Sequence, residues 1–210
     1  MKFTKYIFLI FIIPIYCQFG KNIVQYKSFD WHYIQSKYFD VYFYDSDKGS
    51  TNINSNAEFV ARESLKSYDI ISNAIGWKLK NRIPIIVYNS HNDFQQTNII
   101  DMYMPEGVGG VTELYKNRVV IPFDGNNNQF KTVIHHELVH AFINDYIYKG
   151  SIQNMQNDDV ILIPLWMNEG LAEFLSTPWQ TESDMWMRDL VVNGEKLPKL
   201  NELNGYLAYR

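Results

Sequence analysis

The chain of 210 residues contains one cysteine, Cys17. A single thiol excludes an internal disulfide and any zinc site that needs two or more thiolates. Cys17 closes the apolar run at the start of the chain, so a metal site in the rest of the chain must be built from histidine and carboxylate side chains. The formal net charge is -4 and no long run of Lys or Arg occurs. The sequence thus lacks the basic surface expected of a protein that binds nucleic acid or an anionic membrane.

No apolar run long enough to span a membrane follows the first 17 residues. At the start of the chain, Lys2 and Lys5 precede an apolar run over 6–16, and the polar chain begins near Gln18. This length and these flanks predict that residues 1–17 are a secretory signal peptide. We therefore expect an exported protein, secreted or periplasmic, whose mature chain has no membrane span.

Two alternatives to a cleaved signal peptide stay open. An uncleaved anchor is one, because Ile15 and Cys17 are poorer residues at a cleavage site than small ones. A lipoprotein modified at Cys17 is the other, although the preceding residues 14–16 match the small residues of such a signal poorly.

The composition predicts a folded protein. Hydrophobic residues make up 46% of the chain and aromatic residues 16%. A chain of this size and composition can bury a sizeable core and fits one domain or two small lobes. Apolar periodicity and turn residues predict these elements: a strand in 37–45, a helix from Ser55 to about Ile75 ended by Gly76, a buried strand in 82–90, a short helix within 91–99, two extended pieces in 111–123, and a helix in 181–193.

Two of these elements carry predictions for single side chains. In the 37–45 strand, the alternation places Phe39, Val41 and Phe43 on the buried face and places Tyr38, Asp40, Tyr42 and Tyr44 on the opposite face. In the 55–75 helix, Leu65 is counted among the apolar positions. Residues 20–36 show no pattern that assigns them to an element.

The central motif is H-E-x-x-H, formed by His136, Glu137 and His140 within 132–148. The apolar positions of this stretch predict a helix, which neither Gly nor Pro interrupts before Gly150. Because residues four apart lie on one face of a helix, the two imidazoles can bind one metal ion while the glutamate borders it. The alternative is that both histidines are polar core residues satisfied by their neighbours.

A third ligand can come from the stretch 164–176, PLWMNEGLAEFLS, which predicts a second amphipathic helix. Glu169 and Glu173 are four residues apart on this helix, so one can reach the metal while the other hydrogen-bonds a ligand histidine. The alternative is an exposed acidic helix face. His135 points about 100° away from His136, so it cannot share that metal, and we expect it to support the site or the fold.

The two motifs together, HELVH followed by WMNEGLAEF, resemble the gluzincin zinc metallopeptidases, the thermolysin and aminopeptidase clan, and most closely their peptidase MA-like branch. The resemblance implies that His136, His140 and Glu169 bind one Zn²⁺, and that Glu173 supports the first histidine. It implies hydrolysis of peptide or protein substrates by a zinc-bound water, with Glu137 as general base. The 28 residues between His140 and Glu169 exceed the connection in many members, and the polar 149–160 stretch predicts a surface loop there.

The resemblance also implies the fold, an α+β zincin-type domain over 18–210 with zinc in a cleft between two lobes. A small mixed sheet and the active-site helix would form one lobe, about 37–148, and helices would form the other, about 160–210. Part of 108–123 would lie at a sheet edge and bind substrate as an added strand, whereas the alternative is an ordinary strand.

The end of the sequence predicts an incomplete helical lobe. The chain stops in GYLAYR, at the start of a predicted helix, and the relatives implied by the resemblance continue into more helices and a β-propeller. Tyr206 and Tyr209 are candidate stabilisers of the transition state by position. Two rival functions stay open: a non-catalytic gluzincin-like binding or scaffold module preceding a β-propeller, and a zinc hydrolase that acts on a non-peptide substrate.

Overall fold

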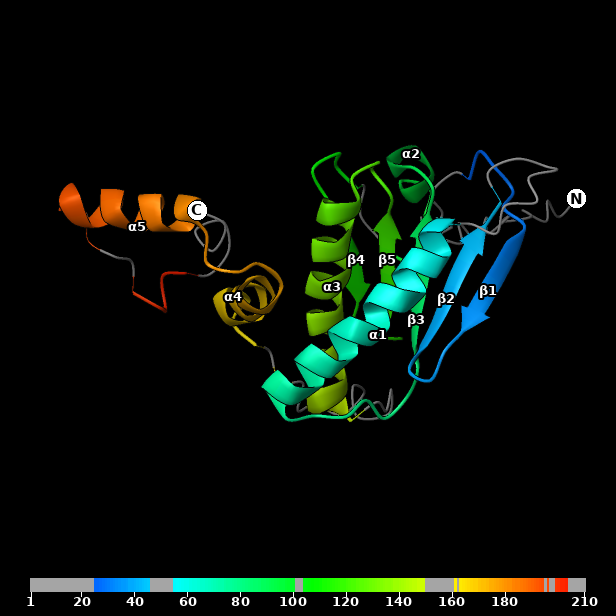
Figure 1. Cartoon of the computed structure of the whole chain (residues 1–210), viewed down its shortest axis with the longest axis horizontal. Helices are drawn as coiled ribbons and strands as arrows, with labels where there is room; N and C mark the ends of the chain where they lie inside the picture. Colours follow the sequence, from blue (N-terminus) through cyan, green and yellow to red (C-terminus); the bar gives the residue numbers. More distant parts are fainter. Residues whose placement is uncertain are drawn as a thin grey trace, which may run out of the picture.

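The computed structural model describes residues 25–45, 55–100, 104–149, 161, 163–194, 196 and 199–203. These residues form an α+β fold with a five-stranded mixed sheet, as the sequence predicts at this level (Figure 1). The predicted signal peptide, Tyr206 and Tyr209 lie outside the described residues. Within the described part of the chain, no helix combines the length and the apolar character needed to cross a membrane.

The sheet has the strand order β1-β2-β3-β5-β4. Its centre is parallel and consists of β2 (Phe39–Tyr44), β3 (Ile83–Tyr88) and β5 (Arg118–Pro122). An antiparallel strand flanks the centre on each side: β1 (Trp31–Gln35) pairs with β2, and β4 (Val111–Glu113) pairs with β5. β4 is therefore an edge strand, which confirms the prediction that part of 108–123 lies at the edge of the sheet.

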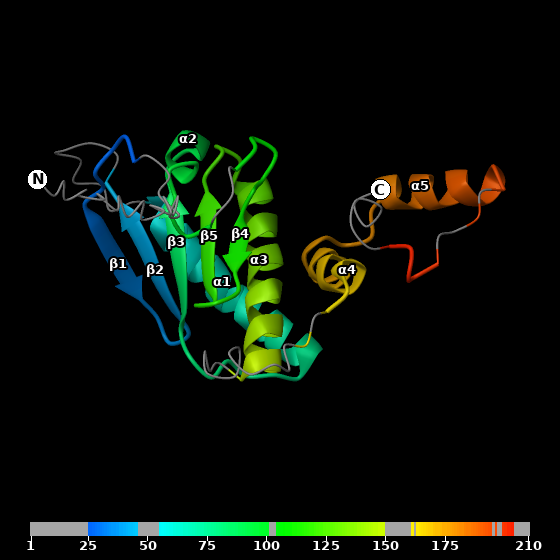
Figure 2. The same ribbon diagram turned by 180° about the vertical axis from the view of Figure 1, so that it is seen from behind.

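Two long helices, α1 (Ser55–Ile75) and α3 (Asn127–Tyr148), cover one face of this sheet (Figures 1 and 2). The main core lies between them and the sheet, where apolar side chains of β2, β3 and β5 meet those of both helices. The short helix α2 (His91–Phe94) follows β3 and contributes to a smaller core on the other face of the sheet. α3 is thus held from two sides, by α1 and by the sheet.

Two further helices follow α3. Helix α4 (Leu165–Ser176) packs against α3, and helix α5 (Thr181–Val192) stands away from the sheet (Figure 1). α5 has no buried residue, and Met185 and Trp186 are each more than half exposed. The predicted helix is therefore present, but most of its apolar side chains are exposed in the described part of the chain.

Helix ends follow the local sequence. Gly76 ends α1 with a φ of 71°, and the backbone N–H groups of Gly76 and Trp77 both donate to the carbonyl of Ser72. α3 begins at Asn127, before the 132–148 stretch that carries the motif, because the Asn126 side chain accepts from the backbone N–H groups of the helix's first turn.

Three side-chain or boundary predictions need correction. Tyr44 was predicted on the open face of β2 but is buried, because the second core covers the end of that face. Leu65 was counted as an apolar face position of α1 but is 38% exposed. The sheet begins at Trp31 and not near 37, because β1 pairs with β2 although four of its five residues are exposed.

Candidate metal and active site

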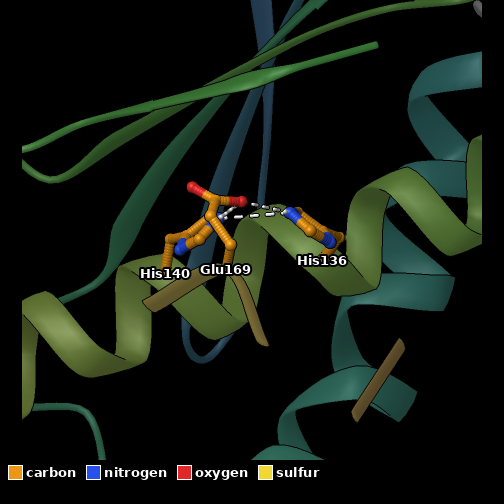
Figure 3. A group of neighbouring side chains, drawn as sticks. All are labelled: His136, His140 and Glu169. Atoms are coloured by element: carbon orange, nitrogen blue, oxygen red, sulfur yellow. Dashed lines mark hydrogen bonds and ion pairs between the residues drawn. The ribbon is translucent and has the colours of Figure 1, made fainter. Parts of the chain in front are cut away.

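The two motif histidines lie one turn apart on α3 and face α4. The Nε2 atoms of His136 and His140 are 3.2 Å apart. Glu169 of α4 points between them, with its Oε2 atom 3.5 Å from His136 Nε2 and 3.6 Å from His140 Nε2 (Figure 3). The structure thus brings together the three predicted ligands from two different helices.

The spacing of these three atoms fits a tetrahedral metal ion. Metal–ligand bonds of about 2.0–2.1 Å at tetrahedral angles place the ligand atoms about 3.3 Å from one another. The observed separations of 3.2, 3.5 and 3.6 Å lie close to that value. Two imidazoles and one carboxylate also form a donor set used by catalytic zinc, which leaves a fourth position open. These three residues could therefore hold one metal ion.

Glu173 lies one turn further along α4, on the side of His136 that faces away from the cluster. Its Oε2 atom is 3.7 Å from His136 Nδ1, which is within range of an ion pair but longer than a hydrogen bond. The Glu173 side chain is 63% exposed. The carboxylate therefore lies beside the first histidine, without the direct hydrogen bond that the sequence analysis considered for it.

Electrostatic coupling within the cluster is strong. The imidazoles of His136 and His140 lower the pKa of Glu169 to about 2. Burial alone would lower the pKa of His140, but the carboxyl groups of Glu169 and Glu137 beside it raise that pKa above its ordinary value. The cluster thus carries a carboxylate that stays ionised at neutral pH and favours a positive charge between the two helices.

Glu137 lies on the same turn of α3 but points toward the sheet edge. Its side chain is buried, and burial raises the pKa of its carboxyl above the ordinary value. The Thr112 hydroxyl of β4 lies 2.7 Å from Glu137 Oε2 and 2.9 Å from the Glu137 backbone carbonyl oxygen. Thr112 was not singled out from the sequence, because a threonine in a strand carries no signal of its own.

A cavity of about 1400 Å³ adjoins these residues. The segment before β4, β4 itself, α3 and α4 form most of its wall. Its polar lining includes Thr112, His136, Glu137, His140, Glu169 and Glu173. Much of the remaining wall is apolar, from residues such as Met104, Val133 and Trp166. The cavity can therefore admit a ligand that contacts both Glu137 and the cluster of His136, His140 and Glu169.

His135 is separate from this arrangement. It is buried on α3, lies outside the cluster of three ligands, and its Nε2 atom has no hydrogen-bond partner among the described residues. Burial lowers the pKa of its imidazole, so the neutral form is favoured. His135 therefore lies apart from the cluster of His136, His140 and Glu169.

No protein-family model matches the chain, and comparisons with curated proteins and with solved structures also give no match. The function must therefore be inferred from the residues that line the cavity and from their geometry. The structure brings together His136, His140 and Glu169, with Glu137 and Glu173 beside them.

Proposed function

We propose that the chain is a zinc-dependent peptidase of the gluzincin type, with a zincin-like fold. The observation that carries this proposal is that three donor atoms from two helices lie 3.2–3.6 Å apart beside a cavity that Glu137 also lines. The order of the motifs, HExxH on one helix and NEGxAE on the next, supports it by resemblance. His136, His140 and Glu169 would hold one Zn²⁺.

The chemistry divides between the metal and the chain. When bound, zinc would supply a Lewis acid that lowers the pKa of a water molecule and polarises a peptide carbonyl. Glu137 would accept the proton of the attacking water and pass it to the leaving amine. Its burial favours this role, because a carboxyl with a raised pKa binds a proton more readily than an exposed one.

The edge strand offers a way to bind a peptide. β4 pairs with β5 on one side only, and both β4 and the glycines before it line the cavity. An extended peptide can add to such an edge through backbone hydrogen bonds. These bonds do not depend on most of the peptide's side chains. A substrate bound there would pass between β4 and the metal cluster, with its carbonyl groups near Glu137.

The first test is metal content and zinc affinity of the purified chain, beside the variant Glu169→Ala. We expect about one zinc per wild-type chain, as in three-ligand catalytic sites, and a sharp loss of affinity in the variant. Glu182→Ala, which removes an exposed carboxylate from α5, serves as the matched control and should bind zinc like the wild type. A wild-type chain that binds no zinc even when zinc is supplied would contradict the proposal.

The second test is hydrolysis of a mixed peptide library by the zinc-loaded chain and by Glu137→Gln. Loss of the general base should lower the rate by about 10²–10⁴-fold while the zinc content stays the same. Full activity in Glu137→Gln would refute the mechanism. Zinc binding by the wild type without cleavage of any peptide would refute the peptidase and favour a binding module or a hydrolase of another substrate.

A further inference from the structure

Thr112 is the side chain of β4 that contacts Glu137. Its backbone is fixed by antiparallel pairing with Val119 of β5. Its hydroxyl oxygen lies 2.7 Å from Glu137 Oε2 and 2.9 Å from the backbone carbonyl oxygen of the same glutamate. The contact therefore joins the edge of the sheet to the middle of α3, across 25 residues of sequence.

The two distances define what this hydroxyl can do. A hydroxyl has one proton and two lone pairs, so it donates to one of the two oxygens at a time and can accept from another donor. Donation to an ionised Glu137 carboxylate is a charge-assisted hydrogen bond, which is stronger than one between neutral groups. If Glu137 carries a proton, the carboxyl O–H can donate to Thr112 while the threonine donates to the backbone carbonyl. The same side chain can thus hold Glu137 before and after it takes up a proton.

The stem of Glu137 is also confined. A Cβ atom built on Gly110 would lie 2.9 Å from Glu137 Cγ, so the backbone of the segment before β4 already touches the glutamate. Gly110 therefore limits where the stem can move, and Thr112 fixes the carboxyl end. A base that must meet a water molecule beside a metal gains from such fixation, because misplacement by about 1 Å can cost about 10²-fold in rate.

We propose that Thr112 is a positioning residue for the general base, whose hydroxyl holds the Glu137 carboxyl toward the cavity. This inference rests on the proposed function, because the carboxyl has a reaction to perform only if Glu137 is the base. Thr112 lines the cavity, and its role in this proposal is to hold Glu137 and not to bind the metal. Its loss should therefore lower the rate of hydrolysis without loss of zinc.

The kinetic test compares Thr112→Val, which keeps the shape but removes the hydroxyl, with Thr112→Ser, which keeps the hydroxyl. We expect Thr112→Val to lower kcat by about 10- to 100-fold, the factor that corresponds to loss of a hydrogen bond to a charged group. KM and zinc affinity should change by less than about two-fold, and Thr112→Ser should recover most of kcat. Thr181→Val, at an exposed position of α5, is the matched control and should behave as the wild type.

Three kinetic outcomes would overturn the proposal. One is an unchanged kcat in Thr112→Val. Another is a Thr112→Ser variant no more active than Thr112→Val, because the loss of kcat would then not come from loss of the hydroxyl. The third is a loss of zinc affinity or a rise in KM as large as the loss in kcat, which would indicate a structural role.

A double-mutant cycle on unfolding tests the contact without any activity measurement. In the zinc-free chain, Thr112→Val should lower the folding equilibrium constant by about ten-fold when Glu137 is present and by less in the Glu137→Ala background, where the Thr112 hydroxyl keeps only its hydrogen bond to the backbone carbonyl oxygen of residue 137. Equal effects in both backgrounds would refute the contact. Coupling in the cycle with no peptide cleavage by the wild type would instead refute the proposed function, and the positioning role with it.

Discussion

A methyl group added at Gly110 should measurably destabilise the protein. Gly110 immediately precedes β4, and its Cβ would lie 2.9 Å from Glu137 Cγ, 3.0 Å from Ile121 Cγ2 and 3.0 Å from Val133 Cγ1. These three side chains come from α3 and β5, so no single movement relieves all the contacts. The φ angle of Gly110 is not in the left-handed region, so the cost arises from crowding and not from backbone strain.

The size of the effect follows from the packing. Overpacking of a well-packed core typically costs about 1–3 kcal/mol, and three simultaneous contacts place Gly110→Ala in the upper part of that range, about 2–3 kcal/mol. For a domain of this size, each kcal/mol lowers Tm by about 2–4 °C, which gives a decrease of about 4–12 °C. Gly109→Ala should cost less, because its Cβ makes one contact under 3.4 Å, at 3.1 Å from Val133 Cγ2.

Urea and thermal unfolding of the zinc-free chain measure these differences. Gly107→Ala is the matched control, since a Cβ there meets nothing within 4 Å, and it should change the free energy of unfolding by less than about 0.5 kcal/mol. The expected order of destabilisation is Gly110, then Gly109, then Gly107. A Gly110→Ala variant as stable as Gly107→Ala would refute the close packing of this segment on α3.

The remaining predictions concern two buried aspartates. Asp145 accepts a 2.8 Å hydrogen bond from Trp77 Nε1, so Asp145→Ala should lower the free energy of unfolding by about 1–3 kcal/mol in urea, and unchanged stability would contradict this. Burial disfavours the charge of Asp93, but the hydrogen bonds from Lys27 and Tyr44 outweigh it and hold its pKa below 3.8. The ionised form therefore stabilises the fold above pH 3.8, and this contribution is lost as the pH falls through the lowered pKa. The difference in free energy of unfolding between the wild type and Asp93→Asn should accordingly narrow below about pH 4. A difference that stays constant from pH 6 to pH 2 would contradict this role of ionised Asp93.

The elements that the sequence predicted correctly are those whose pattern reflects burial. β2 alternates because Phe39 and Val41 point into the main core, and α1 and α3 show apolar positions where they meet the sheet. β1 shows no such pattern, because four of its five residues are exposed and its place in the sheet depends on pairing with β2. A pattern of apolar residues also cannot tell what will cover it, as the exposed Trp186 of α5 demonstrates.

The site likewise contains residues that the sequence predicts and one that it does not. Spacing on a helix was enough to predict that His136 and His140 share a face, and the resemblance added Glu169 as their partner, which the structure brings within 3.6 Å of both. Thr112 could not be predicted, because its contact with Glu137 depends on how closely the sheet edge approaches α3. The sequence around Thr112 and the sequence around Glu137 give no indication of that distance.

Few fully buried side chains keep helix α4 in place. Ala172 is its one fully buried residue, Leu171 and Leu175 are partly buried against the core, and Phe174 is 77% exposed, so a few apolar side chains hold α4 on the core. In the unfolded chain, 28 residues separate His140 from Glu169, and closing a flexible loop of that length costs about 3 kcal/mol of chain entropy. An ion bound by both helices would act as a crosslink across that loop. Amide hydrogens of α4 would then exchange with solvent at a rate set by zinc occupancy, while those in the centre of α3 would not.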